Sequence, residues 1–239
     1  MMEELLPESV VVVENRGDDG GEDAPLYPEE QALLTRAVAK RRREFAAVRS
    51  CARRAMEKLG VPPGPVLPGE RGAPRWPAGL IGSMTHCDGY RAAALARATD
   101  LASVGIDAEP HQGLPEGVLE SIALPSETAR LARLRTREPA VHWDRLLFSA
   151  KESVYKAWFP LTGEWLDFSE ADIDIAVTAH SADAAPATGG FRARLLVPGP
   201  VVNGHRVSSF DGRWTVRDGL LATAVTIPHD PAGGGPRGS

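Results

Sequence analysis

A proline- and glycine-rich stretch, VPPGPVLPGERGAPRWPAG at residues 61–79, limits how this chain can fold more than any other feature. Proline lacks a backbone N–H donor, and glycine weakens the interior of both helices and strands. Neither a helix nor a strand can continue through a stretch with so many prolines and glycines. The stretch therefore predicts a long surface loop that separates the regular structure before residue 61 from the structure after residue 79.

Hydrophobic periodicity predicts a helix before this loop and a strand-rich region after it. Residues 8–14 form a β-branched run typical of a strand, and residues 28–59 show an amphipathic helical pattern that ends at Gly60. Further strands are expected at 80–86, 90–98, 102–109, 173–177, 191–197 and 214–227, and further helices at 124–134, with Ser126 as N-cap, and 142–158. We also expect a mobile loop at 14–25 and a disordered tail at 229–239. This order of elements predicts an α+β fold.

Charge and composition narrow the functional class. The chain of 239 residues has a net charge of −5, and 43% of its residues are hydrophobic. No apolar run is long enough to span a membrane, and the acidic N-terminal residues differ from a signal peptide. The two cysteines, Cys51 and Cys87, are typical of reduced thiols rather than a disulfide framework. We therefore expect a cytoplasmic protein that binds neither membrane nor nucleic acid, while the basic segment 34–58 indicates a phosphorylated small ligand or an acidic partner.

The segment VGIDAEP at residues 104–110 ends an apolar strand with two acids. Because residues i and i+2 of a strand face the same side, Asp107 and Glu109 present both carboxylates to one place. Without a countercharge the two would repel, and Mg²⁺, which prefers carboxylate oxygens, would relieve that repulsion. A solvated strand end has the same pattern, so the pair alone leaves both interpretations open.

The helix predicted at residues 142–158 carries a second pair of charges. Glu152 and Lys156 are four residues apart and therefore share one face, as in a catalytic site or in an ordinary surface ion pair. Ser149 also avoids the stripe that we expect to be buried. That stripe consists of Trp143, Leu147, Ala150, Val154 and Ala157.

The segment GSMTHCDG at residues 82–89 ends an apolar strand with small polar residues and a histidine. Thr85 and His86 could bond phosphate oxygens, or the segment could be a turn with a satisfied histidine. We exclude a Cys87–His86 nucleophilic pair, since adjacent strand residues point to opposite faces.

Together these segments resemble the Sfp-type 4′-phosphopantetheinyl transferases. The hallmarks of that family are a (V/I)G(V/I)D strand and a downstream (F/W)-x-x-K-E-(S/A)-x-x-K helix, which stand here as VGID and FSAKESVYK. The resemblance extends from about residue 28 to residue 227. The segments RRREFAAVRSCARRA, GSMTHC, GIDAEP and HWDRLLFSAKES are most similar to actinobacterial-style enzymes that activate polyketide and nonribosomal peptide carrier proteins in secondary metabolism.

The resemblance implies that the chain transfers the 4′-phosphopantetheine arm of coenzyme A to a serine of an apo acyl or peptidyl carrier protein, releasing 3′,5′-ADP. It implies Mg²⁺, with Mn²⁺ as an alternative, bound by Asp107, Glu109 and Glu152. Asp107, Glu152 and Lys156 would be catalytic, with Glu152 as the base that accepts the serine proton.

The resemblance also implies a set of residues that bind coenzyme A. Arg41, Arg49 and His86 would hold the 3′-phosphate, and Thr85 would lie near the diphosphate. Lys151 and Lys156 would contact the phosphates. Arg71 would supply the charge of a lysine that relatives often carry where this chain has Ala73. The remaining arginines of the basic segment are expected on a solvated helix face; they include Arg42, Arg43, Arg53 and Arg54.

The fold implied by the resemblance is a monomeric pseudo-dimer of two similar lobes, each a small sheet packed with helices. Residues 1–105 would form the lobe for the 3′-phosphate and adenine, and residues 106–228 the lobe with the metal and the catalytic helix. Two other functions stay open. A Mg²⁺-dependent phosphohydrolase or nuclease would act without a carrier protein. A non-catalytic module that binds coenzyme A would have no reason to keep both Glu152 and Lys156.

Overall fold

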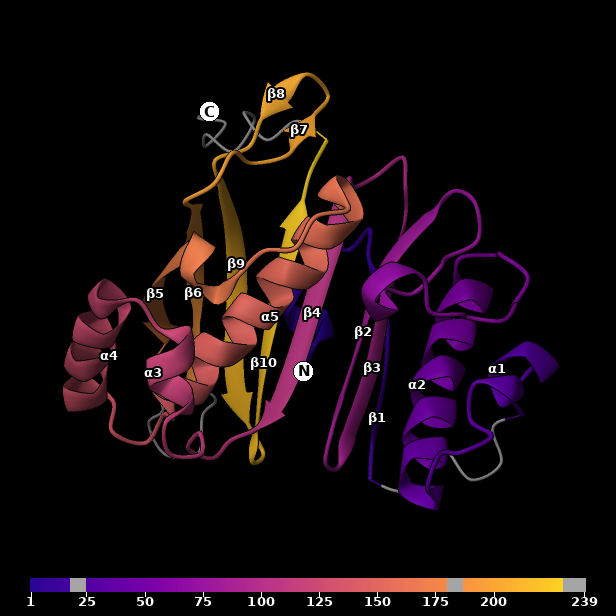
Figure 1. The fold of residues 1–239 in the computed structure, drawn as a ribbon, viewed down its shortest axis with the longest axis horizontal. Helices are drawn as coiled ribbons and strands as arrows, with labels where there is room; N and C mark the ends of the chain where they lie inside the picture. Colours follow the sequence, from indigo (N-terminus) through magenta and orange to yellow (C-terminus); the bar gives the residue numbers. More distant parts are fainter. Residues whose placement is uncertain (18–24, 180–186, 230–239) are drawn as a thin grey trace.

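Two antiparallel sheets stand side by side in the computed structural model of the chain, which describes residues 1–17, 25–179 and 187–229 (Figure 1). The smaller sheet has the strand order β1-β3-β2 and the larger one the order β4-β10-β9-β6-β5. The strands are β1 (Val11–Arg16), β2 (Leu80–Cys87), β3 (Tyr90–Arg97), β4 (Ser103–Pro110), β5 (Ala171–Ala179), β6 (Ala187–Leu195), β9 (Ser209–Arg217) and β10 (Leu220–Ile227). Strands β7 (Val201–Val202) and β8 (His205–Arg206) form a small separate hairpin. The predicted α+β class is confirmed.

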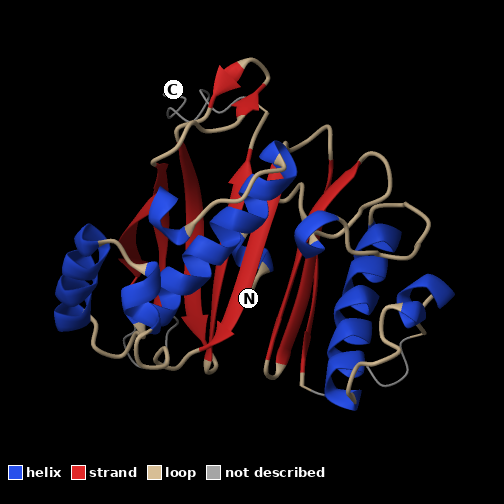
Figure 2. Cartoon of the chain, viewed as in Figure 1, coloured by secondary structure: helices blue, strands red, loops and turns tan. Residues whose placement is uncertain are grey.

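Helix α2 (Ala39–Lys58) covers the outer face of the smaller sheet (Figure 2). The single helix predicted at 28–59 is wrong, because α1 (Pro28–Ala32) is separated from α2 by a turn at 33–38. The side chain of Arg42 donates to two carbonyl oxygens of this turn, those of Thr35 and Ala37, at 3.3 and 3.0 Å. The apolar stripe of the helix begins only at Phe45, so no buried face continues the helix upstream.

Helix α5 (Trp143–Thr162) lies across the larger sheet, with α3 (Val118–Ile122) and α4 (Pro125–Arg137) beside it (Figure 1). All five residues of its predicted stripe are buried. The predicted N-cap of α4 at Ser126 is wrong. The helix begins at Pro125, and Glu127 accepts the backbone N–H of Leu124 at 2.7 Å, so the cap position is Leu124.

Gly105 lets α5 lie directly on β4. A β-carbon at this position would collide with the carbonyl oxygen of Ser153 and lie 2.6 Å from the backbone nitrogen of Ala157. Only glycine fits here without moving the helix. This close approach brings Glu152 and Lys156 of α5 toward the end of β4.

A hydrophobic cluster joins the two sheets, with alanines of β3 on one side and residues of β4 and β10 on the other. The neighbouring strands β2 and β4 share no ladder. Instead, the hydroxyl of Ser83 accepts the N–H of Ile106 at 3.1 Å, and that of Thr85 accepts the N–H of Ala108 at 3.0 Å. The predicted lobe boundary between residues 105 and 106 falls inside β4, which pairs with β10 along its whole length. We therefore propose a boundary ahead of Ser103.

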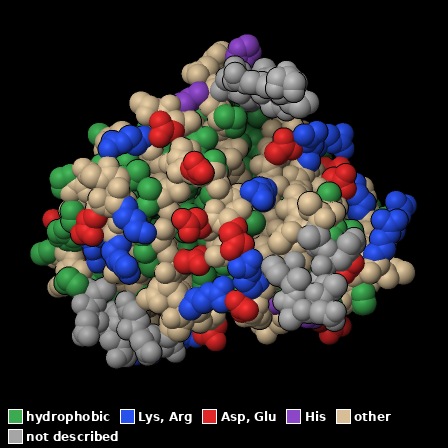
Figure 3. Space-filling view, turned by 180° about the vertical axis from the view of Figure 1, so that it is seen from behind, with side chains coloured by type: hydrophobic (Ala, Val, Ile, Leu, Met, Phe, Trp, Pro, Cys, Tyr) green, Lys and Arg blue, Asp and Glu red, His purple; other side chains and the backbone are tan. Residues whose placement is uncertain are grey.

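The pseudo-symmetry of the lobes stays a prediction, since the described sheets have three and five strands. Most of the predicted mobile loop (18–24) and of the predicted tail (230–239) lies outside the described residues. Among the helices that the structure describes, none is both long and apolar enough to cross a membrane. On the face seen in Figure 3, acidic and basic side chains are intermixed.

Candidate active site

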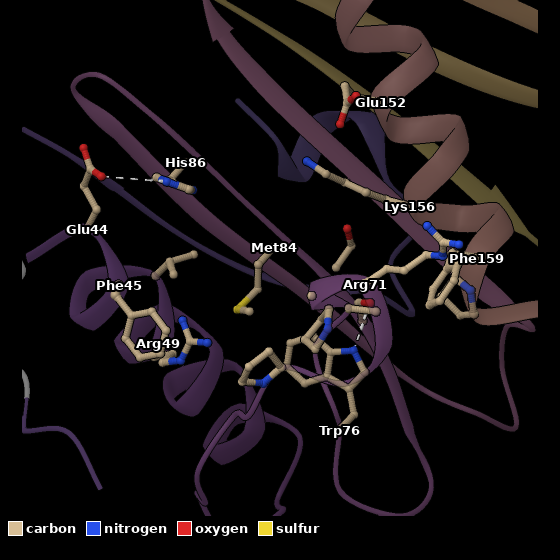
Figure 4. Close-up of a pocket in the computed structure, with 18 of the residues that line it drawn as sticks. Glu44, Phe45, Arg49, Arg71, Trp76, Met84, His86, Glu152, Lys156 and Phe159 are labelled. Carbon is tan, nitrogen blue, oxygen red and sulfur yellow. Dashed lines mark hydrogen bonds and ion pairs between the residues drawn. The ribbon is translucent and has the colours of Figure 1, made fainter. Parts of the chain in front are cut away.

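A cavity of about 810 Å³ lies between α2 and α5, with the loop at 68–76 and strand β2 completing its wall (Figure 4). The helices that pack on the two sheets therefore both contribute to it. The predicted site residues that line it are Arg41, Arg49, Arg71, His86, Glu152 and Lys156. Residues from widely separated parts of the sequence thus meet at one place, which suits a ligand of the size of a nucleotide cofactor.

The α2 end of the cavity is cationic. Arg41 Nη1 lies 3.2 Å from His86 Nε2, and the guanidinium of Arg49 lies 3.1 Å from the ring centroid of Phe45. Burial lowers the pKa of Arg49 to about 10, and burial together with the charge of Arg41 lowers the pKa of His86. These shifts reflect positive charges held close together in a partly desolvated place. Glu44 lies 3.9 Å from His86 and is the acid of this group.

At the other end of the cavity, Lys156 bonds the carboxylate of Asp107, which does not itself line the cavity and is only 4% exposed. Its Oδ1 accepts from Lys156 Nζ at 2.7 Å and from the hydroxyl of Thr85 at 3.3 Å. Its Oδ2 is buried and has no hydrogen-bond partner within the described residues. A buried carboxylate oxygen without a partner is costly, so this atom is suited to accept a cation.

Two further carboxylates share the surroundings of Asp107. Burial and the charge of Asp107 raise the pKa of Glu109, whose Oε2 accepts from Arg145 at 3.0 Å. Burial also raises the pKa of Glu152, and Lys156 opposes that shift. As the side chains stand, no three acidic, histidine or cysteine residues of the described chain converge closely enough to hold a metal ion. The donor chemistry nevertheless fits a hard divalent cation, because the oxygen ligands are carboxylates and Asp107 leaves one of its oxygens unpaired.

Arg71 lies at the tip of the loop in the cavity wall. Its φ angle of 51° is unusual for a residue other than glycine. Its guanidinium lies 5.4 Å from the ring centroid of Trp165, which follows α5. Ala73 lines the cavity two residues further along. The structure thus brings Arg71 to the cavity, where its charge was expected.

Two of the predicted contacts to the cofactor are not found in the cavity. Lys151 is 3% exposed, and its Nζ donates to the carbonyl oxygens of Phe168 and Ala171 at 2.6 and 2.8 Å and pairs with Glu127 at 3.0 Å. The charge of Lys151 is therefore satisfied by contacts with α4 and with the chain at the start of β5. Thr85 is also buried, and its hydroxyl bonds Asp107 and Ala108 rather than facing the cavity.

Ser149 corrects a further expectation about α5. It is fully buried, and its hydroxyl lies 2.9 Å from that of Thr223 on β10. The buried face of the helix is therefore wider than its apolar stripe, because hydroxyl pairs satisfy polar atoms there.

Several residues at the site were not predicted from the sequence. They are Glu44, Phe45, Met84 and Tyr155, which line the cavity, and Arg145, which holds Glu109. Helical and strand spacing could have found four of them. Phe45 lies one turn from both Arg41 and Arg49, and Met84 lies two residues before His86 on the same face of β2.

Comparison with known proteins identifies one family. Residues 29–96 match the model of the 4′-phosphopantetheinyl transferase N-terminal domain, and residues 103–188 match that of the 4′-phosphopantetheinyl transferase superfamily. The chain is 56% identical to 4′-phosphopantetheinyl transferase Svp of Streptomyces mobaraensis, over 98% of this chain and 91% of the relative. It is 50% identical to Npt of Nocardia iowensis (94% and 99%) and 50% identical to PptT of Mycobacterium tuberculosis (84% and 85%), both 4′-phosphopantetheinyl transferases.

These matches cover both sheets and both walls of the cavity, and they confirm the family that the sequence motifs predicted. The chain belongs to the 4′-phosphopantetheinyl transferase superfamily.

Proposed function

We infer that this protein transfers the 4′-phosphopantetheine arm of coenzyme A to a serine of an apo carrier protein, giving holo carrier and 3′,5′-ADP. The family and the names of its relatives support this function. The structural observation that carries it is a single cavity that joins a cluster of cations on α2 to Glu152 and Lys156 on α5. Such a cavity can hold an elongated, multiply phosphorylated molecule with its reacting phosphate near the carboxylates.

We place coenzyme A in the cavity by matching its phosphate groups to the cationic side chains. Arg41, Arg49 and His86 would bind the 3′-phosphate, because guanidinium groups form strong charge-assisted hydrogen bonds with phosphate. Arg71 would lie on the adenine side. The diphosphate would then reach Lys156, whose Nζ is held by the carbonyl oxygen of Ile106 at 3.1 Å and by Asp107.

Asp107, Glu109 and Glu152 would hold a divalent cation, Mg²⁺ or Mn²⁺. When bound, such an ion neutralises the charge of the diphosphate and makes its phosphorus more open to attack. The unpaired Oδ2 of Asp107 and the raised pKa values of Glu109 and Glu152 support this assignment.

The remaining chemistry belongs to side chains of this protein. Burial raises the pKa of Glu152, which makes its carboxylate a better acceptor for the proton of the incoming serine hydroxyl. The serine oxygen forms a bond to the phosphorus that carries the pantetheine arm, and the bond from that phosphorus to 3′,5′-ADP breaks. Lys156 would stabilise the charge that develops on the leaving phosphate.

We further propose that the protein acts as a monomer on carrier proteins of polyketide and nonribosomal peptide synthesis. One chain already supplies both walls of the cavity, so a second copy is not needed to complete it.

The decisive test is incubation of the protein with coenzyme A, Mg²⁺ and an apo carrier protein, followed by mass spectrometry of the carrier. We expect the carrier to gain one phosphopantetheine group, and a carrier whose acceptor serine is replaced by alanine to stay unmodified. Release of 3′,5′-ADP at the same rate without any carrier would indicate a hydrolase instead.

A further inference from the structure

Arg49 is the buried arginine of the cationic cavity end, and its contacts leave part of the guanidinium free. Its Nε donates to the carbonyl oxygen of Val66 at 2.9 Å, and its plane lies against the ring of Phe45 (Figure 4). In the part of the chain that the structure describes, its two terminal nitrogens have no hydrogen-bond partner. They belong to the cavity wall and remain available to a ligand.

Glu30 contacts Arg49 and Val66 but does not line the cavity. This carboxylate of α1 is 0% exposed. Its Oε1 accepts the N–H of Val66 at 2.8 Å and lies 3.7 Å from Arg49 Nε, while its Oε2 accepts the N–H of Tyr27 at 3.0 Å. Val66 is thus held by its N–H to Glu30 and, through its carbonyl, holds Arg49 in turn.

Arg53 is the second cation on Glu30. It lies one turn after Arg49 on α2 and was expected on a solvated face, but it is buried. It donates to both oxygens of Glu30, at 3.3 and 3.1 Å, and to the carbonyl oxygen of Pro25 at 2.8 Å. Arg53 does not line the cavity. One buried carboxylate therefore serves two arginines, and only one of them reaches the cofactor site.

We propose that Glu30 is a positioning residue for coenzyme A, because it fixes Val66 and the Nε edge of Arg49 so that the terminal nitrogens of Arg49 point at the 3′-phosphate. The proposal rests on the proposed function, which places that phosphate at Arg49. An arginine that is already oriented loses little side-chain entropy when phosphate binds, so its hydrogen bonds contribute more to affinity. Glu30 itself does not touch the cofactor.

The test compares coenzyme A with dephospho-coenzyme A, which lacks the 3′-phosphate, as substrates of the intact protein and of Glu30→Gln. The glutamine keeps the shape but not the charge, and its amide group cannot accept from all the donors around it. We expect KM for coenzyme A to rise by about tenfold or more, the loss of one charge-assisted hydrogen bond, with little change in kcat. The preference for coenzyme A over dephospho-coenzyme A should shrink by the same factor.

Arg53→Met is the matched control, since it removes a bond to the same buried carboxylate without touching Arg49 or the cavity. Both variants should melt at a lower temperature than the intact protein, but Arg53→Met should keep the full preference for coenzyme A. An equal loss of preference in Arg53→Met would mean that α1 has merely loosened, and the proposal would be wrong. Full preference in Glu30→Gln would overturn it as well.

Two further measurements separate the possible failures. Glu30→Asp keeps the charge but withdraws it by one methylene. Its preference for coenzyme A over dephospho-coenzyme A should lie between those of the intact protein and Glu30→Gln. This variant replaces Glu30→Gln if the glutamine variant does not fold. Calorimetric titration of both cofactors measures the same preference without turnover. Absence of transfer by the intact protein would contradict the proposed function, whereas equal binding of both cofactors by the intact protein would contradict the role of Glu30.

Discussion

The two ends of the cavity differ in what the protein does with their charges: it orients cations at one end and crowds carboxylates together at the other. At the α2 end, Arg49 rests on Phe45 and bonds Val66, and its Nε lies 3.7 Å from the carboxylate of Glu30. At the β4 end, Asp107 keeps a buried oxygen without a partner among the described residues. Burial and that same acid raise the pKa of Glu109.

The difference matches what each end would do. A phosphate that only anchors the cofactor is bound best by cations that are already oriented, since little reorganisation is then needed. A reacting group needs charges that become satisfied only when metal and substrate arrive, because only interactions that are stronger in the transition state accelerate the reaction. The comparison therefore predicts effects on binding at the α2 end and effects on turnover at the β4 end.

The largest expected effect is that of Glu152→Gln at the β4 end. Loss of the base and of one carboxylate ligand should lower kcat by roughly 10²–10⁴-fold, while KM for coenzyme A changes far less. Steady-state transfer assays followed by mass spectrometry measure both constants. Glu164→Gln, an exposed change just after α5, is the control and should be silent. A nearly normal kcat in Glu152→Gln would exclude it as the base.

The same substitution, lysine to methionine, can be made at both lysines of α5, Lys151 and Lys156. Lys151→Met removes the counterion of the buried Glu127 and should lower the free energy of unfolding by about 3–5 kcal/mol, with unchanged KM for coenzyme A. Lys156→Met should abolish most transfer with a smaller loss of stability. Urea unfolding and transfer assays on both variants measure the two effects. If Lys151→Met is as stable as the intact protein but binds coenzyme A weakly, Lys151 contacts the cofactor after all.

Arg41→Ala tests the anchoring end. Removing one cation from the phosphate should weaken coenzyme A by about 1.5–3 kcal/mol and leave dephospho-coenzyme A almost unaffected. The measurement is a double cycle of variant and substrate, read as kcat/KM. Arg42→Ala is the control, because that guanidinium bonds the turn at 33–38 instead. If Arg41→Ala weakens both cofactors equally, the 3′-phosphate lies elsewhere.

The smallest expected effect concerns pH and His86. Burial and Arg41 lower its pKa in the folded protein, whereas in the unfolded chain it titrates near the ordinary value of about 6.5. The neutral ring therefore favours the folded state above about pH 6.5, and this contribution is lost as the pH falls and the unfolded chain takes up the proton first. We therefore expect the melting temperature of His86→Gln to fall less than that of the intact protein when the pH is lowered from about 7.5 to about 5.5, on either side of that pKa. Identical pH profiles of the two proteins would show that His86 does not sense its cationic neighbours.

Most helices and strands could be predicted from periodicity, whereas the two motifs were identified by their resemblance to a family. The single strand predicted at 214–227 is wrong, because β9 and β10 form a hairpin there. Several other errors concern the direction of side chains within an element. Lys151 follows the buried stripe of α5, four residues after Leu147 and three before Val154, so its helical position already indicated burial. Its partner Glu127 is on another helix, and that contact could not be inferred without the tertiary fold. Thr85 and His86 are adjacent on β2 and face opposite sides, so only one of them could reach the cavity.

Other features depended on contacts between distant segments. The position of α1 beyond the break at 33–38 depends on contacts with the loop after α2, such as the bond from Val66 to Glu30. The pairing of Arg145 with Glu109 joins two elements 36 residues apart. Local patterns carry no information about such pairs, whereas they place Asp107, Glu152 and Lys156 on the correct strand and helix.

Gly105 sets the distance between β4 and α5, which carry the candidate catalytic residues, without taking part in the chemistry itself. Because a β-carbon there would collide with the backbone of α5, even alanine, the smallest substitution, would push the helix away from β4. All the ionisable residues of the site would remain in the sequence, but the carboxylates of the strand and the helix would be separated. A chain could thus keep a complete set of catalytic residues and still be inactive.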